Sequence, residues 1–213
     1  MTDWVRTLLA DEDMLQMGHG QTAVDHNLGL GHLYYGLARA LRPRTVVVIG
    51  SWRGFVPIIL AKAISENEGG GVVHFIDPSL VDDFWRDPGK TRAHFESHGV
   101  TNVHHHLATT QEFLTTDANH ALASVDLLFI DGLHSLEQVR FDYEAFRSRL
   151  SPDAVVLFHD SARVRLSRIY GDDRPYEHQV KLFVDELRTD SSLDVFDLPI
   201  DAGVTLVRKR SAT

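Results

Sequence analysis

Val125-Asp-Leu-Leu-Phe-Ile-Asp-Gly-Leu-His134 and Phe158-His-Asp160 are the two stretches of the sequence that decide the fold. Each is an apolar run that ends abruptly in residues able to ligate a metal or to move a proton. Apolar runs without alternation are typical of parallel strands buried on both faces. In an open α/β sheet, ligands bind at the carboxyl ends of such strands. We therefore expect four side chains to converge on one rim of a parallel sheet: Asp131, His134, His159 and Asp160.

The composition is that of an ordinary soluble globular protein. The chain has 213 residues, a net charge of -9 and no cysteine. Its length suits one α/β domain spanning residues 1–213. The negative charge argues against a nucleic-acid partner, and no apolar run approaches the roughly 20 residues that span a membrane. The first residues show no signal-peptide pattern, so we expect a cytoplasmic protein.

Strands and helices alternate along most of the sequence, which predicts a doubly wound, mostly parallel sheet of seven strands. The last two strands form a terminal antiparallel hairpin, and helices precede the first strand. The expected strands are residues 45–49, 72–76, 103–107, 125–130, 154–158, 193–198 and 204–208. The expected helices are residues 3–15, 28–41, 55–65, 90–98, 110–114, 136–150 and 177–187. A turn at Ser151-Pro-Asp153 and a substrate-facing loop at residues 161–176 complete the prediction.

A glycine turn, Gly50-Ser-Trp-Arg-Gly54, joins the first strand to its helix. Glycine lets a ligand approach the backbone closely, and the amides that open the helix favour an electron-rich group. Asp77 ends the second strand, where a carboxylate accepts hydrogen bonds from a ribose. Since no phosphate-binding glycine motif occurs, a nucleoside without phosphates is the better match. The alternatives are a turn that only packs tightly and a solvated loop acid at Asp77.

These motifs together resemble class I S-adenosylmethionine-dependent methyltransferases. The resemblance covers roughly residues 18–209 and is narrower for the branch of catechol-type and macrolide-sugar O-methyltransferases. The narrower resemblance is carried by the motif from Phe129 to Asp142, together with Val155-Val-Leu-Phe-His-Asp160. It is carried upstream by Gly18-His-Gly-Gln-Thr22, which is similar to a segment that lines the cofactor pocket in catechol-type enzymes.

The resemblance implies that the cofactor is S-adenosylmethionine. Gly50 and Ser51 would contact its methionine part, Asp77 its ribose, and Leu107–Thr110 its adenine. The full set of cofactor-binding residues that we expect is Gly50, Ser51, Gly54, Asp77, Thr109 and Asp131. One position departs from the family, which often has an acid where this sequence has Val48. The group that holds the amino end of the cofactor is therefore undefined.

Methyl transfer to oxygen needs a deprotonated hydroxyl, produced by a general base or by a divalent cation. By the resemblance, His134 is the general base, with Asp131 beside it. Asp131, His159 and Asp160 would hold Mg²⁺, although histidine is a poor magnesium ligand, so another cation or none is also compatible. Three structural roles remain open: Asp131 as a helix cap, His134 as a surface residue, and His159 as a histidine that only positions its neighbours.

The sequence thus favours an S-adenosylmethionine-dependent O-methyltransferase that acts on a small-molecule hydroxyl, with or without a divalent cation. Its expected partner is the small-molecule substrate, without nucleic acid or membrane, and a homo-oligomer is left open. Two rival functions are kept. One is a cofactor-binding protein of the same fold without methyl transfer. The other is a nicotinamide-dependent oxidoreductase, against which the absence of the second glycine of Gly-x-Gly counts.

Overall fold

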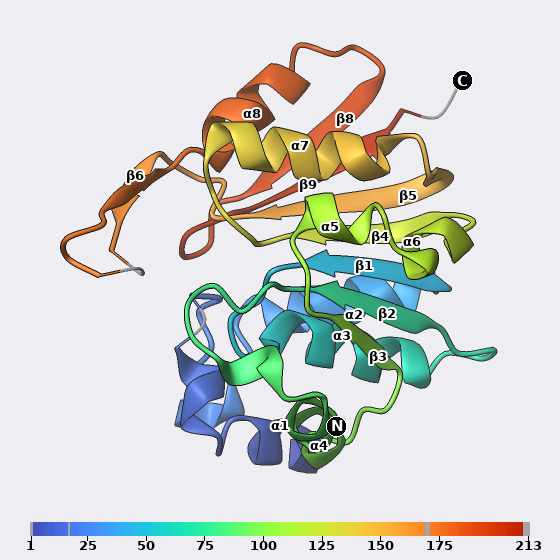
Figure 1. Ribbon diagram of the computed structural model, residues 1–213, viewed down its shortest axis with the longest axis vertical. Coiled ribbons are helices and arrows are strands. Elements are labelled where there is room, and N and C mark those ends of the chain that lie inside the picture. The colour runs from blue at the N-terminus through green and yellow to red at the C-terminus, as the bar shows by residue number, and fades with distance from the viewer. Residues whose placement is uncertain (1, 17, 169–170, 211–213) are drawn as a thin grey trace. The chain divides into compact units, whose positions relative to one another are not determined.

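The computed structural model describes residues 2–16, 18–168 and 171–210 (Figure 1). It divides into two compact units, Met1–Thr109 and Thr110–Thr213, and each unit is described here by itself. The single domain over residues 1–213 stays a prediction. Among the described residues, no helix combines the length and the apolar character that crossing a membrane requires.

The first unit contains three parallel strands in the order β3-β2-β1. Its elements are α1 (Thr2–Leu8), η1 (Glu12–Leu15), η2 (Val24–His26), α2 (Gly31–Leu41), β1 (Thr45–Ile49), α3 (Phe55–Ser65), β2 (Val72–Ile76), η3 (Phe84–Arg86), α4 (Pro88–Ser97) and β3 (Val103–His106). Val46, Val47 and Val48 of β1 are fully buried, as expected for a strand covered on both faces. Helix α3 contacts all three strands and α2. It is therefore apolar around nearly its whole circumference.

The second unit contains four strands in the order β4-β5-β9-β8, of which only β4 and β5 are parallel. Its elements are α5 (Thr110–Phe113), α6 (Asp117–Ala121), β4 (Val125–Ile130), α7 (Leu136–Arg147), β5 (Leu150–His159), β6 (Arg165–Ser167), β7 (Tyr176–His178), α8 (Val180–Leu187), β8 (Leu193–Leu198) and β9 (Val204–Lys209). Helices α7 and α8 pack against each other, α7 on β4 and α8 on β5.

The predicted fold class is confirmed, because seven strands form a mixed, mostly parallel sheet with β8 and β9 as an antiparallel hairpin. The predicted helix at residues 3–15 is wrong in its middle, where α1 ends at Leu8 and η1 begins at Glu12. Asp11 causes the break, because its side chain accepts a hydrogen bond from the amide of Asp13 and caps the second helix.

The predicted turn at Ser151-Pro-Asp153 is also wrong, because β5 runs without a break from Leu150 to His159. Leu150 pairs with Val125 and Val155 pairs with Leu127, so the intervening residues of β5 form an irregularity in the register. An irregularity of this kind accommodates a proline within a strand.

Residues 161–176 do not form one loop, and the predicted helix at 177–187 begins three residues late. Strand β6 pairs with β7 in an antiparallel ribbon, with Arg165 opposite His178 and Ser167 opposite Tyr176. In Figure 1 this ribbon projects away from the sheet of its unit. Because Tyr176–His178 is used as a strand, α8 starts only at Val180. Residues 169 and 170 of the expected loop lie outside the described residues.

Candidate active site

The glycine turn of the first unit has a backbone that needs its two glycines. Gly50 has φ +69° and donates its amide to Ile76 O at 2.9 Å, which joins β1 to β2. Gly54 has φ +85°, and a Cβ placed there would lie 3.1 Å from the ring of Trp85. Any other residue at Gly50 or Gly54 would be strained by the positive φ. At Gly54 its Cβ would also be pressed against the ring of Trp85. The turn between β1 and α3 therefore has the backbone conformation and the small residues that let a ligand approach the start of a helix.

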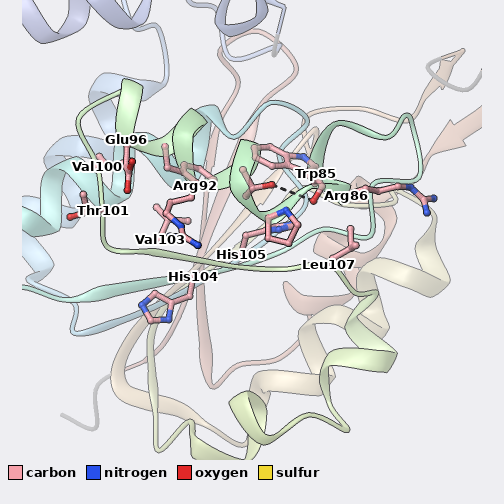
Figure 2. Close-up of a pocket in the computed structure, with 13 residues that line it drawn as sticks. Trp85, Arg86, Arg92, Glu96, Val100, Thr101, Val103, His104, His105 and Leu107 are labelled. Atoms are coloured by element: carbon pink, nitrogen blue, oxygen red, sulfur yellow. Dashed lines mark hydrogen bonds between the residues drawn. The ribbon is translucent and has the colours of Figure 1, made fainter.

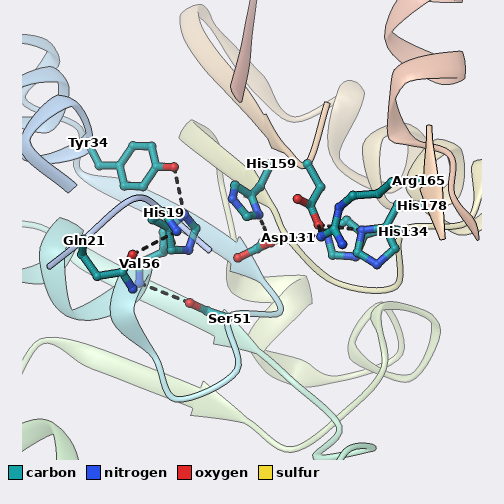
Figure 3. Close-up of polar contacts among 11 residues, drawn as sticks. His19, Gln21, Tyr34, Ser51, Val56, Asp131, His134, His159, Arg165 and His178 are labelled. Carbon is teal, nitrogen blue, oxygen red and sulfur yellow. Dashed lines mark hydrogen bonds and ion pairs between the residues drawn. The ribbon is translucent and has the colours of Figure 1, made fainter. Parts of the chain in front are cut away.

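Ser51 is buried and its Oγ accepts a hydrogen bond from the amide of Val56 at 3.2 Å (Figure 3). This contact satisfies one amide in the first turn of α3, whose N-cap residue is Gly54. Val48, where the related family often has an acid, is fully buried in β1. This position therefore offers no carboxylate to the amino end of the cofactor.

Asp77 lies half-buried at the end of β2 and takes part in the local backbone structure. Its Oδ1 accepts a hydrogen bond from the amide of Ser79 at 2.7 Å, and its own amide donates to His106 O at 3.1 Å. The first contact is the loop-closing role that the sequence left open. The ribose-binding role of Asp77 stays a prediction. Thr109 is half-buried in the connection that follows β3.

The segment Gly18–Thr22 is fixed by its own polar contacts. The amide of His19 donates to Gln21 Oε1 at 3.0 Å (Figure 3). Gln21 Nε2 donates to Met14 O at 2.7 Å. The ring of His19 stacks on Phe55, the first residue of α3, with centroids 5.2 Å apart. This contact holds the segment next to the glycine turn, within the same unit.

In the second unit, Asp131 and His159 form a direct pair. Nδ1–H of His159 donates to Asp131 Oδ1 at 2.7 Å, and Figure 3 shows the imidazole directed at the carboxylate. Asp131 follows β4 and only 10% of its side chain is exposed. It does not cap α7, because Ser135 Oγ accepts the amide of Gln138 and provides that cap. The helix-cap alternative for Asp131 is therefore wrong.

His134 lies between two carboxylates. Its Nε2 is 3.4 Å from Asp131 Oδ1 and 3.5 Å from Asp160 Oδ2. Its side chain is 11% exposed, so it is not a surface residue. Asp160 is more deeply buried, with 4% of its side chain exposed, and it has φ +57°. The structure thus brings together the four rim residues that the sequence singled out.

Two further residues belong to this cluster, and the sequence did not identify them as part of it. His178 Nδ1 lies 2.6 Å from Asp160 Oδ2, and Arg165 Nη2 donates to the same oxygen at 2.5 Å. The rings of His178 and His134 stack in parallel, with centroids 4.2 Å apart. Both residues come from the β6–β7 ribbon, although the sequence predicted a loop around Arg165 and a helix around His178. Each strand of the ribbon is only three residues long, which is too short for its sequence pattern to predict a strand.

The cluster has a surplus of nitrogen donors around two acids. Although burial alone would raise the pKa of Asp160, hydrogen bonding by His178 and the nearby charges of His159 and His134 hold that pKa well below its ordinary value. Asp160 Oδ1 is the one carboxylate oxygen of this residue without a hydrogen-bond partner among the described residues. Magnesium prefers hard oxygen ligands in an octahedral arrangement. The residues therefore fit Mg²⁺ poorly.

A separate cavity of about 350 Å³ lies in the first unit, between η3, α4 and β3 (Figure 2). Its lining includes Trp85, His105 and Leu107. Leu107 is the one lining residue that also lies in the stretch expected to contact the adenine. The glycine turn and Asp77 are not part of its lining.

Comparisons with known proteins agree with this architecture. A family model described as a methyltransferase domain matches residues 47–161. An uncharacterized protein, y4gI of Sinorhizobium fredii, is 31% identical over 149 residues, which are 64% of this chain. The chain spans only 15% of the length of that relative.

Solved structures share the fold at low sequence identity. A methyltransferase from Geobacter sulfurreducens has a TM-score of 0.61 at 21% identity, over 85% of this chain and 78% of its own. The O-methyltransferase TomG from Streptomyces achromogenes, solved with S-adenosylmethionine, has a TM-score of 0.67 at 18% identity, over 98% and 89%. An O-methyltransferase from Bacillus cereus, solved with S-adenosylhomocysteine, has a TM-score of 0.66 at 16% identity, over 98% and 91%.

Proposed function

The chain belongs to the methyltransferase-domain family, and on this premise we propose that it transfers a methyl group from S-adenosylmethionine to a hydroxyl of a small molecule. The observation that carries the proposal is His134, held between the carboxylates of Asp131 and Asp160. A small-molecule acceptor is supported by the net charge of -9, which disfavours nucleic acid. It is also supported by the description of the similar TomG as an enzyme of tomaymycin synthesis.

The first unit supplies the cofactor-binding residues in this proposal. The glycine turn presents backbone amides at the start of α3, and its positive φ values keep side chains away from an approaching ligand. Asp77 accepts hydrogen bonds from the ribose hydroxyls, and Thr109 lies on the adenine side. Asp131, the remaining cofactor-binding residue predicted from the sequence, lies in the second unit.

The second unit supplies the base. The neutral ring of His134 carries its hydrogen on Nε2, which faces the two carboxylates, so Nδ1 accepts the hydroxyl proton. The oxygen attacks the methyl carbon, and the bond from that carbon to sulfur breaks to leave S-adenosylhomocysteine. Asp131 and Asp160 stabilise the imidazolium that forms. His159 fixes the orientation of Asp131, while Arg165 and His178 fix that of Asp160.

A divalent cation held by Asp131, His159 and Asp160 would make the hydroxyl more acidic. The nitrogen-rich set of donors argues against Mg²⁺ in that position. The proposed reaction therefore relies on histidine as the base, and cation dependence is a separate outcome of the tests.

The proposal is tested by calorimetry with S-adenosylmethionine on the parent, Asp77→Asn and a control, Glu68→Gln. The asparagine keeps an oxygen that accepts the amide of Ser79, so the loop stays closed. Its Nδ2 cannot accept a hydrogen bond, so one charge-assisted hydrogen bond from the ribose is lost, which corresponds to about 1.5–3 kcal/mol, or a roughly 10- to 150-fold higher Kd. Glu68 is exposed in the connection before β2, and its replacement leaves the Kd unchanged.

Three results would overturn parts of this proposal. An unchanged Kd in Asp77→Asn would remove the ribose assignment. Binding of NAD in preference to S-adenosylmethionine would favour the oxidoreductase. Tight cofactor binding without release of S-adenosylhomocysteine, across a panel of phenolic, sugar and aliphatic hydroxyl acceptors, would favour the cofactor-binding protein.

A further inference from the structure

Three side chains of the first unit form a second cluster that the proposed reaction does not use. Asp11 precedes η1, His94 lies in the last turn of α4, and His98 follows that helix. One ligand atom from each residue lies within 4.8 Å of the other two. His94 and His98 are four residues apart, so one helical turn places both rings on the same side of α4.

His94 and Asp11 are already oriented by hydrogen bonds to the backbone. Each uses one polar atom of its side chain for this bond and leaves the other for a ligand. Nε2–H of His94 donates to Arg53 O at 2.8 Å, which fixes the tautomer and leaves Nδ1 as the acceptor nitrogen. Oδ1 of Asp11 accepts the amide of Asp13 at 3.0 Å, which leaves Oδ2 on the side of the histidines. A backbone carbonyl that holds the second nitrogen of a histidine is the usual support of a metal ligand.

His98 is the third and most deeply buried member, with 5% of its side chain exposed. Neither of its ring nitrogens has a hydrogen-bond partner among the described residues, although Nε2 lies 3.3 Å from Asp11 Oδ2. Burial without such partners has a free-energy cost for an imidazole. The rings of His94 and His98 have centroids 4.9 Å apart and lie at 79° to each other, so they pack edge to face beside Asp11.

We propose that Asp11, His94 and His98 bind a divalent transition-metal ion of the zinc type. Two imidazole nitrogens and one carboxylate oxygen, with a water as fourth ligand, are a zinc donor set. Ligand atoms around a tetrahedral zinc are about 3.4 Å apart, given metal–ligand distances of roughly 2.0–2.1 Å, so small side-chain adjustments complete the site. The nitrogen donors exclude magnesium and calcium as the preferred ions.

The environment supports this assignment. Asp13 adds a second acid nearby, although Arg53 Nε pairs with it at 3.2 Å. Because His94 also holds the carbonyl of Arg53 in the glycine turn, the ion would link that turn to the N-terminal segment.

The test is metal analysis of the full chain after dialysis against Zn²⁺, together with titration by Co²⁺ monitored by its visible absorption. The variants are Asp11→Asn, His94→Gln and the control His104→Gln, whose parent side chain is exposed on β3. Asp11→Asn keeps the oxygen that caps η1, and the side-chain amide introduced by His94→Gln can still donate to Arg53 O. Both are therefore expected to fold, which circular dichroism without metal checks.

The parent and His104→Gln should each retain one zinc, gain thermal stability on adding it and give a tetrahedral Co²⁺ spectrum. Asp11→Asn and His94→Gln should bind at least about 10-fold more weakly, since loss of even a supporting contact costs 10- to 100-fold. A fifth protein, Asp131→Asn, should keep this zinc. The proposal is overturned if the parent binds no zinc. It is equally overturned if the zinc persists in Asp11→Asn and His94→Gln, or if it is lost only in Asp131→Asn.

Discussion

At the scale of single residues, His134 has the geometry of a base whose protonated form is stabilised on two sides. Asp131 and Asp160 both lie within 3.5 Å of its Nε2, and His178 stacks on its ring. A positive charge formed on this ring therefore has two carboxylates to stabilise it. Loss of the imidazole removes the proton acceptor and leaves these acids facing each other.

His134→Ala should lower kcat by about 10²- to 10⁴-fold, the usual contribution of general-base catalysis. Its Kd for S-adenosylmethionine should change little, because the expected ribose and methionine contacts lie in the first unit. The measurement pairs release of S-adenosylhomocysteine with calorimetry, and His120→Ala, at an exposed position of α6, is the control. An unchanged kcat, or activity that EDTA abolishes and Mn²⁺ restores in both parent and variant, would assign the activation of the hydroxyl to a cation instead.

At the scale of elements, helix α7 buries an acidic side chain on its otherwise apolar face. Val139, Asp142, Tyr143 and Phe146 form its buried face, at the spacing of an amphipathic helix. Asp142 is the one acid among them, and Gln138 Nε2 donates to its Oδ1 at 2.8 Å. Burial raises the pKa of Asp142 to about 6. The folded state therefore holds a proton that the unfolded state releases between pH 4 and 6.

Asp142→Asn should therefore stabilise the protein at pH 7 by up to about 3 kcal/mol, since one pKa unit corresponds to about 1.4 kcal/mol. The folded-state pKa is raised, so the parent loses stability as pH increases from about 4 to 6, and the variant does not share this loss. Urea unfolding at pH 4, 5, 6 and 7 measures the difference, with Glu144→Gln on the exposed face of α7 as control. Equal stability of parent and Asp142→Asn at pH 7 would contradict the inferred cost of this buried charge.

The elements show where sequence patterns suffice and where they do not. The apolar runs at Thr45–Ile49 and Val125–Ile130 predict β1 and β4 because complete burial leaves no room for alternation. The same pattern fails for β6 and β7, which are three residues long and only become strands by pairing with each other. Since three-residue strands carry almost no pattern, His178 and Arg165 could not be assigned to the rim from the sequence.

At the scale of the whole molecule, the family match confirms the resemblance to class I S-adenosylmethionine-dependent methyltransferases that the rim and glycine motifs indicated. The motif residues predicted which side chains gather at the strand ends, because strand polarity alone sends them there. The partner of each side chain was not predictable. The hydrogen bond between His159 and Asp131, and the ion pairs of Asp160, depend on rotamers and on the β6–β7 ribbon. The roles of these residues in catalysis stay predictions.

The overall response to acid provides a test of the fold that is independent of catalysis. His105 and His106 lie half-buried in β3, and burial lowers the pKa of each to about 4. The unfolded chain binds protons on these rings near pH 6.5, whereas the folded chain does not until pH falls close to 4. Their contribution to stability is therefore complete above about pH 6.5 and is lost as pH falls from 6.5 to 4. Asp142 acts in the opposite direction over part of that range.

We expect His106→Gln to lose less stability than the parent between pH 7 and pH 4.5, by about 1–2 kcal/mol, because a half-buried ring keeps part of its hydration. The same difference should appear between Asp142→Asn and the double variant Asp142→Asn, His106→Gln. Because the opposing titration of Asp142 is absent there, the stability of Asp142→Asn should fall more steeply with acid than that of the parent. Urea unfolding across this pH range measures both, and His120→Gln, exposed on α6, should follow the parent. If His106→Gln and His120→Gln show the same pH dependence, the buried ring of His106 is not a source of acid sensitivity. The loss would then have to come from other groups, such as His74, whose Nδ1 lies 3.1 Å from His106 Nε2 and whose pKa is also lowered by burial.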